Sequence, residues 1–132
     1  METFYKDLSR GEAIEQELLN KIQLKYPNAY KVEGYFKDYD LYVPEIDKSI
    51  EVKSDEKSKY TGNIVIEIEF NNKPSALITT KAKFWVIYDG YSYNWFLTDK
   101  IKDCIKDNNL RYAEFIGKGD TKSKKAYLIK KE

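Results

Sequence analysis

The chain has 132 residues, of which 42% are hydrophobic and 34% charged, and its formal net charge is +1. This composition argues against disorder and predicts a single domain over residues 1–132 that is not strongly basic. With no run of about 18 apolar residues and no apolar signal-peptide core at its start, it is expected outside membranes, in the cytoplasm or in the host cytoplasm if viral.

The first predicted helix covers residues 9–24, where apolar residues recur at helical spacing. Ser9 is a candidate N-cap with Glu12 as its capping-box partner, and Pro27 ends the segment. Glu15 lies one turn before an apolar pair and borders the buried face, from which its carboxylate could reach a metal site. Acids in this part of a helix also suit the helix dipole, and most are solvated.

Two strand-like stretches, 36–43 and 49–53, predict an antiparallel hairpin. Because side chains alternate between the two faces of a strand, Asp40 would lie opposite Glu51, with Lys53 one pleat away on the same side. Two carboxylates and an ammonium in one place can hold a hard cation and activate a water, as metal-dependent phosphodiester cleavage requires. A non-catalytic hairpin with charged residues on its solvent-exposed face would have the same residue pattern.

Residues 62–70 form the clearest strand pattern in the chain and are expected beside the strand of Glu51. Residues 71–83 predict a turn followed by a short helix. Hydroxyls and an ammonium there suit either a phosphate backbone or ordinary capping. The residues concerned are Ser75, Thr79, Thr80 and Lys81.

The second half predicts a central strand at 84–88, a hairpin to a strand at 93–97, a helix over 98–109 capped by Thr98 or Asp99, and a strand at 126–129. The resulting order of elements predicts a mixed α/β fold with one sheet flanked by helices.

Lysines gather in two places despite the low net charge. One group, with Lys53 and Lys57, lies at and just beyond the Glu-x-Lys tripeptide, and the other lies within residues 118–131. Either group could follow a phosphate backbone, and either could be a solvated surface.

Residues 9–88 resemble the PD-(D/E)XK nuclease superfamily, whose signature is an acid on the first helix, then Asp, then Glu-x-Lys on an αβββαβ core. Asp40, Glu51 and Lys53 match the strand positions. Glu15 best matches the helix acid, with Glu12 as the alternative. The stretch GEAIEQELL is similar to a Glu-x-Glu-Leu stretch of archaeal Holliday junction resolvases. The signature's proline is missing, since a tyrosine precedes the aspartate.

The resemblance implies a restriction-endonuclease-like core with a carboxylate-held metal. Asp40, Glu51 and the carbonyl of Val52 would bind Mg²⁺, for which Mn²⁺ substitutes, and Glu15 would help through a second ion or a bound water. Lys53 would position or deprotonate the attacking water, or steady the charge that develops on phosphorus. The run from residue 62 to 86 also resembles small phage and archaeal nucleases, in which the matching helix contacts substrate. The expected substrate contacts are Ser75, Thr80, Lys81 and Lys57.

The absence of histidine and the single cysteine exclude histidine-dependent nucleases and Cys-rich zinc sites. The preferred function is a structure-selective, Holliday junction resolvase-like DNA endonuclease of recombination, repair or phage DNA processing. It would act on branched or duplex DNA as a homodimer with one site per strand. The alternatives are an inactive module that binds nucleic acid or protein, and a restriction-type enzyme whose base contacts the sequence does not locate.

Overall fold

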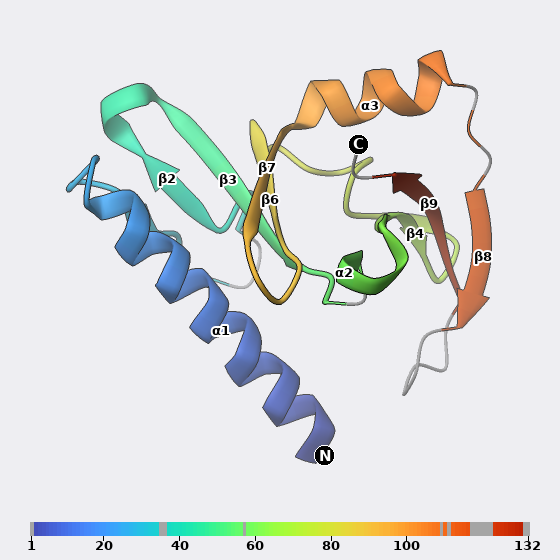
Figure 1. Ribbon diagram of the computed structural model, residues 1–132, viewed down its shortest axis with the longest axis horizontal. Helices are drawn as coiled ribbons and strands as arrows, with labels where there is room; N and C mark the ends of the chain where they lie inside the picture. Colours follow the sequence, from blue (N-terminus) through green and yellow to red (C-terminus); the bar gives the residue numbers. More distant parts are fainter. Residues whose placement is uncertain are drawn as a thin grey trace.

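The computed structural model describes residues 2–34, 37–56, 58–108, 110, 112–116 and 123–130. Over these residues the chain is a mixed α/β structure with two sheets (Figure 1). The first sheet has the strand order β1-β2-β3-β6-β7, and the second has the order β5-β4-β9-β8. The α/β class is confirmed, whereas the prediction of one sheet is wrong.

Helix α1 (Glu2–Gln23) packs along one face of the first sheet (Figure 1). Its apolar stripe includes Leu18, Leu19 and Ile22, which are 2%, 6% and 8% exposed. The helix begins earlier than predicted, so Ser9 lies inside it and is not its N-cap. Burial of each such side chain contributes about 1.5–3 kcal/mol, which fixes the rotation of α1 against the sheet.

The predicted hairpin is formed by β2 (Leu41–Val43) and β3 (Lys48–Ser54), which pair antiparallel, and β1 (Tyr30–Lys31) pairs with β2 on the other side. The connection is the short 3₁₀ helix η1 (Pro44–Ile46), followed by a left-handed residue that turns the chain back. In the register Leu41 is opposite Ile50, so the next position brings residue 40 beside residue 51. Strand β2 starts later than the predicted residue 36.

Strand β6 (Phe84–Tyr88) is central, as predicted, lying parallel to β3 and antiparallel to β7 (Tyr93–Leu97). Helix α3 (Thr98–Asp107) follows β7 directly. The prediction of a Thr98 or Asp99 cap is wrong, because no side chain caps this helix and the Thr98 hydroxyl donates to the carbonyl of Ala82 at 2.7 Å.

The second sheet contains β4 (Asn63–Phe70), β5 (Lys73–Pro74), β8 (Tyr112–Ile116) and β9 (Ser123–Lys130), and the short helix α2 (Ser58–Thr61) precedes it. Strand β4 pairs with β5 and β9, so the prediction that it lies beside the strand of Glu51 is wrong. The final strand is confirmed and is longer than predicted.

The short helix predicted within residues 71–83 does not form, and residues 76–79 make turns instead. Asn71, Asn72 and Ala76 have positive φ values of 51°, 62° and 43°. A right-handed helix requires negative φ, so the backbone of Ala76 interrupts it where the prediction placed its start.

Two apolar cores lie on opposite sides of the first sheet. Val86 of β6 belongs to the core under α1, whereas Trp85 and Ile87 belong to the core shared with β4 and α3. Glu51 and Lys53 are the register partners of Trp85 and Ile87 on the parallel strand β3. Both charged side chains therefore leave the sheet on the side that faces β4.

Among the helices that the structure describes, none has both the length and the apolar character needed to cross a bilayer.

Candidate active site

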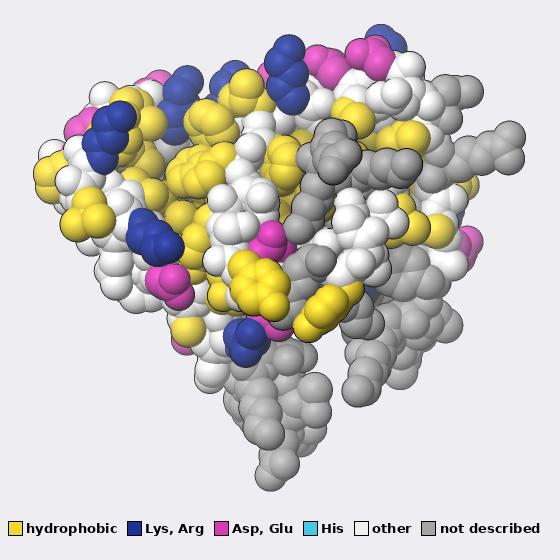
Figure 2. Space-filling view, in the orientation of Figure 1, with side chains coloured by type: hydrophobic (Ala, Val, Ile, Leu, Met, Phe, Trp, Pro, Cys, Tyr) yellow, Lys and Arg dark blue, Asp and Glu magenta, His cyan; other side chains and the backbone are white. Residues whose placement is uncertain are grey.

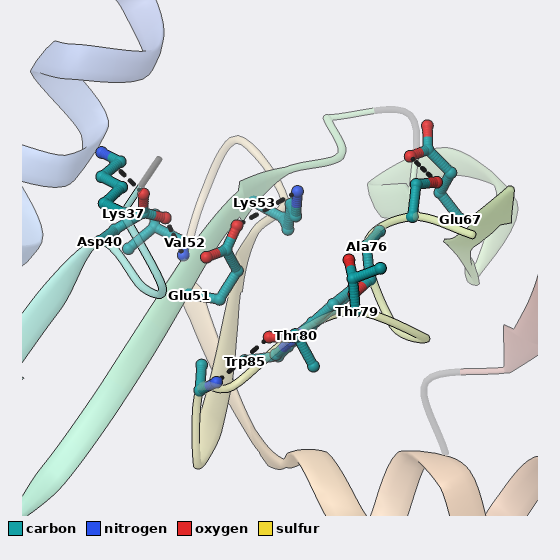
Figure 3. A network of polar contacts seen from close by, with 12 residues as sticks. Lys37, Asp40, Glu51, Val52, Lys53, Glu67, Ala76, Thr79, Thr80 and Trp85 are labelled. Atoms are coloured by element: carbon teal, nitrogen blue, oxygen red, sulfur yellow. Dashed lines mark hydrogen bonds and ion pairs between the residues drawn. The ribbon is translucent and has the colours of Figure 1, made fainter. Parts of the chain in front are cut away.

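The carboxylate of Asp40 lies at the point where the β2–β3 ladder ends, and the residue is only 6% exposed (Figure 3). Its Oδ2 accepts a hydrogen bond from the N–H of Val52 at 2.8 Å, and its own N–H donates to the carbonyl of Ile50 at 2.9 Å. Its Oδ1 lies 3.0 Å from Nζ of Lys37. These contacts compensate the burial of a charge and hold the carboxylate in place.

The backbone of Val52 adds a second polar group beside Asp40. In an extended strand the N–H and C=O of one residue point toward the same neighbouring strand. The Val52 carbonyl, the predicted metal ligand, is therefore directed to the side on which Asp40 lies, while the Val52 side chain packs against the core under α1.

Glu51 and Lys53 share a face of β3, as the alternation predicts, and their Oε2 and Nζ atoms are 3.3 Å apart. The ammonium of Lys53 also lies 5.6 Å from the centre of the Trp85 ring, a cation–π arrangement that orients it. Burial, followed by the negative charge of Asp40, raises the pKa of Glu51 above its ordinary value. Asp40 and Glu51 are thus close enough to repel each other.

Glu15 reaches the same region from α1. Its two carboxylate oxygens lie 3.8 Å from Nζ of Lys37 and 3.5 Å from Nζ of Lys31. Burial and then the charge of Asp40 raise the pKa of Glu15. The structure thus brings Glu15 to Asp40, while the alternative helix acid, Glu12, is exposed.

Lys37 is the main site residue that the sequence pattern did not indicate. Although partial burial lowers its pKa, the hydrogen bond and charge of Asp40, with the charges of Glu15 and Glu51, raise it overall. Lys37 precedes Asp40 by three residues, which the predicted strand over 36–43 would place on opposite faces, and its bridge to α1 depends on the tertiary fold.

A cleft of about 430 Å³ opens beside Glu51, between β3, β4 and the turn at 76–80. Figure 3 shows Lys37 and Asp40 toward α1, and Glu51 and Lys53 toward the turn that carries Thr79 and Thr80. The cleft is lined by Lys37, Asp38, Glu51, Lys53, Glu67, Ala76, Thr79 and Thr80.

The predicted substrate contacts lie in different surroundings. Thr80 lines the cleft, where its hydroxyl oxygen accepts from the Trp85 indole N–H at 3.3 Å. Ser75 donates to Oε2 of Glu67 at 2.7 Å. Glu67 is an acid that the sequence pattern did not indicate as a site residue. Lys81, whose side chain is 70% exposed, lies 3.5 Å from Asp38 at the cleft. The fourth residue, Lys57, lies outside the described residues, as do residues 118–122 and 131 of the lysine-rich stretch.

The donor atoms of the site have the chemistry that Mg²⁺ and Mn²⁺ prefer, since carboxylate and carbonyl oxygens are hard ligands. In the part of the chain that the structure describes, no three Asp, Glu, His or Cys side chains stand close enough together to hold a metal ion. Glu15, Asp40 and Glu51 therefore fit a metal by type, but they do not form a closed coordination shell in this arrangement.

No protein-family model, no curated protein and no solved structure matches this chain.

Proposed function

We propose that this protein is a metal-dependent endonuclease that hydrolyses phosphodiester bonds in DNA. The observation that carries the proposal is the meeting of α1, the start of β2 and strand β3, where the charge of Asp40 acts on both Glu15 and Glu51 and where Glu51 and Lys53 line one cleft. Burial and mutual repulsion raise the pKa values of two of these acids. Partly buried acids with perturbed pKa values are typical of functional sites.

The order of elements supports a PD-(D/E)XK core as part of this proposal. Helix α1 precedes three antiparallel strands, β1, β2 and β3, and the parallel strand β6 follows after a crossover, which agrees with an αβββαβ pattern. The chain departs from that pattern in the crossover, which carries α2, β4 and β5 in place of a longer helix.

In this proposal the oxygens of Asp40, Glu51 and Val52 would hold Mg²⁺, and Glu15 would contribute from α1. A bound ion supplies Lewis-acid catalysis and lowers the pKa of a coordinated water. Asp40 stays oriented because the N–H of Val52 fixes one of its oxygens. Lys53, held by Glu51 and stacked on Trp85, positions the attacking water or neutralises charge that develops on the phosphate.

The ammonium and hydroxyl groups of the cleft, which lie beside the carboxylates of Asp38, Glu51 and Glu67, support a phosphate-containing substrate. Lys53, Thr79 and Thr80 lie along its wall and suit contacts to phosphate oxygens. Ser75, Lys81 and Lys57 remain proposed outer contacts. The proposed substrate is branched or duplex DNA, and Holliday junction-like resolution in recombination, repair or phage DNA processing is the preferred activity.

A homodimer belongs to the same proposal, since two sites are needed to cut two strands. Strand β7 is the edge of the first sheet, and its side chains Trp95 and Leu97 are 47% and 36% exposed. Figure 2 shows hydrophobic side chains gathered over the region where β6 and β7 lie in Figure 1. This edge is the proposed contact between two copies.

The test is a cleavage assay with branched, linear duplex and single-stranded DNA in Mg²⁺ or Mn²⁺. Native protein is expected to cut, with branched DNA cut fastest, and Asp40→Asn and Lys53→Met are expected to be inactive while still folded. Asp99→Asn on α3 is the matched control, because its carboxylate is 77% exposed and its surface ion pair with Lys83 lies outside the proposed site. A native protein that cuts none of these DNAs would contradict the proposal.

A non-catalytic module that binds nucleic acid or protein is the second candidate. It is favoured by the pairing of Glu15 and Asp40 with Lys37, which satisfies both carboxylates without a metal. Tight DNA binding without cleavage in either metal would establish this alternative.

A further inference from the structure

The ammonium of Lys37 lies where the acids of the site converge. Its Nζ is 3.0 Å from Oδ1 of Asp40 and 3.8 Å from Oε1 of Glu15, and the charge of Glu51 also acts on it. The two contacted acids come from different elements, α1 and the segment before β2. Lys37 thus holds together carboxylates that would otherwise repel each other.

The charges of the site are balanced by lysine side chains. Each carboxylate has an ammonium within 4 Å, at distances of 3.0 to 3.8 Å. The charged groups are Glu15, Asp40, Glu51, Lys31, Lys37 and Lys53. A divalent cation would add two positive charges to this balanced group, and two like charges a few ångströms apart in a partly buried site repel strongly.

The geometry leads to the same conclusion. Mg²⁺ binds oxygen at about 2.0–2.1 Å, whereas an ammonium contacts carboxylate oxygens at about 2.7–2.9 Å. Oxygens arranged around Nζ of Lys37 are therefore too far apart for a metal, in agreement with the finding that, among the described residues, no three acids lie close enough to bind one. The ion and the ammonium cannot occupy the same position.

Lys37 has a route out of this position. Its side chain is 27% exposed, and the residue precedes β2 in a segment without regular secondary structure. It also lines both the cleft beside Glu51 and a second hollow of about 460 Å³ under α1. Asp40, by contrast, is fixed by the N–H of Val52 and stays behind when the lysine leaves.

We propose that Lys37 is an internal counter-ion that occupies the metal position of the free protein and must swing out before a divalent cation binds. This inference rests on the proposed function. The released ammonium enters the cleft, where it pairs with a phosphate of the substrate. Metal and DNA phosphate then strengthen each other's binding, because the phosphate holds Lys37 away from the acids.

The test measures Mn²⁺ binding by electron paramagnetic resonance in the absence of DNA, so its readout does not depend on activity. Lys37→Met is expected to bind Mn²⁺ about tenfold more tightly than native protein, since the competing cation is gone. Lys37→Arg keeps the charge and is expected to bind no more tightly than native protein. Asp40→Asn is expected to lose binding.

The decisive control is Lys31→Met. It removes the same charge 3.5 Å from Glu15, but Lys31 pairs with the other oxygen of Glu15 and does not bridge to Asp40. Its affinity is expected to rise by no more than about threefold, the effect of net charge alone. Equal gains in both variants would show that position does not matter and would overturn the inference.

The remaining outcomes separate this inference from the proposed function. If native protein and Lys37→Met bind Mn²⁺ equally and Asp40→Asn does not bind, the counter-ion role is wrong and the metal site stands. If neither binds at millimolar Mn²⁺, both the inference and the metal-dependent function are wrong.

Discussion

Asp40 has a structural role that is separable from chemistry, because its carboxylate satisfies the N–H of Val52 and pairs with Lys37 in a nearly buried place. Asp40→Ala is expected to lower the free energy of unfolding by about 1–3 kcal/mol, since both partners lose their acceptor. Asp40→Asn keeps an oxygen for the Val52 N–H and is expected to lose less. Urea denaturation of the two variants measures the difference, and equal stabilities would contradict this role.

Glu51 gives a prediction for pH. Burial and the charge of Asp40 raise its folded-state pKa, so the folded chain binds this proton more tightly than the unfolded chain. Its stabilising contribution is therefore complete below the ordinary pKa and is lost as the pH rises through the raised value. Relative to native protein, Glu51→Gln is expected to gain stability as the pH rises through that window.

Thermal unfolding measured over a series of pH values upward from the ordinary glutamate pKa measures this difference. Glu17→Gln on the exposed side of α1, where the carboxylate is 57% exposed, is the control for the loss of one surface charge, and the gain of Glu51→Gln is expected to exceed its gain. If the difference in stability between Glu51→Gln and native protein does not change with pH, the pKa of Glu51 is not raised in the folded protein.

The acids of the site could be predicted from the sequence because alternation in a hairpin fixes which residues face each other. The relative positions of Asp40, Glu51 and Lys53 follow from two-residue alternation along two strands joined by a turn. Lys37 and Glu67 could not be found in this way. The position of Lys37 follows from an irregular segment and from the docking of α1, and Glu67 comes from another sheet.

At the scale of elements, α1 positions Glu15 through its apolar stripe. Leu18→Ala is expected to cost about 2–5 kcal/mol of unfolding free energy, because Leu18 is 2% exposed in the core under the helix. Leu24→Ala is the matched control: Leu24 is 89% exposed, and a change within about 0.5 kcal/mol is expected. Guanidinium denaturation compares the two, and similar costs would mean that α1 is not docked through this stripe.

The sequence pattern predicted an element correctly where the apolar residues keep one spacing along the whole element. The hairpin of β6 and β7 and the helix α3 are examples, since strand alternation and helical spacing are each continuous there. The helix expected within 71–83 does not form because Ala76 has a positive φ, a backbone conformation that the spacing of apolar residues does not encode.

At the scale of the whole molecule, the core between the sheets joins Ile64 and Ile66 of β4 to Trp85 and Ile87 of β6. Both tryptophans of the chain lie in the first sheet, and Trp85 also packs in the core shared with β4, so tryptophan fluorescence reports on the first sheet and on its contact with the second. Ile66→Ala in the second sheet is expected to lower stability by about 2–5 kcal/mol.

The single-domain prediction requires this loss to appear equally in fluorescence and in far-ultraviolet circular dichroism, with coincident transitions. A fluorescence transition that stays at the native midpoint while the circular dichroism shifts would show two independent units. The shared core is the contact that would couple the unfolding of the two sheets, because it joins β4 of one sheet to β6 of the other.

The pairing of strands is the part of the fold that the sequence left undetermined. The alternation in β4 shows which of its residues are buried but not which strand lies beside it. Its main partner is β9, more distant along the chain than the expected neighbour β3. The two-sheet arrangement, and with it the wall of the cleft that carries Glu67, depends on that distant pairing.

The most direct measurement of the central claim is single-turnover cleavage of a branched DNA in Mg²⁺ by native protein and by Lys53→Met, with DNA binding measured on the same samples. We predict that native protein cleaves and that Lys53→Met, which loses one proposed phosphate contact, still binds the DNA but cleaves at least about a hundredfold more slowly. Equal cleavage by both proteins, or none by either, would contradict the assignment of this site to phosphodiester hydrolysis.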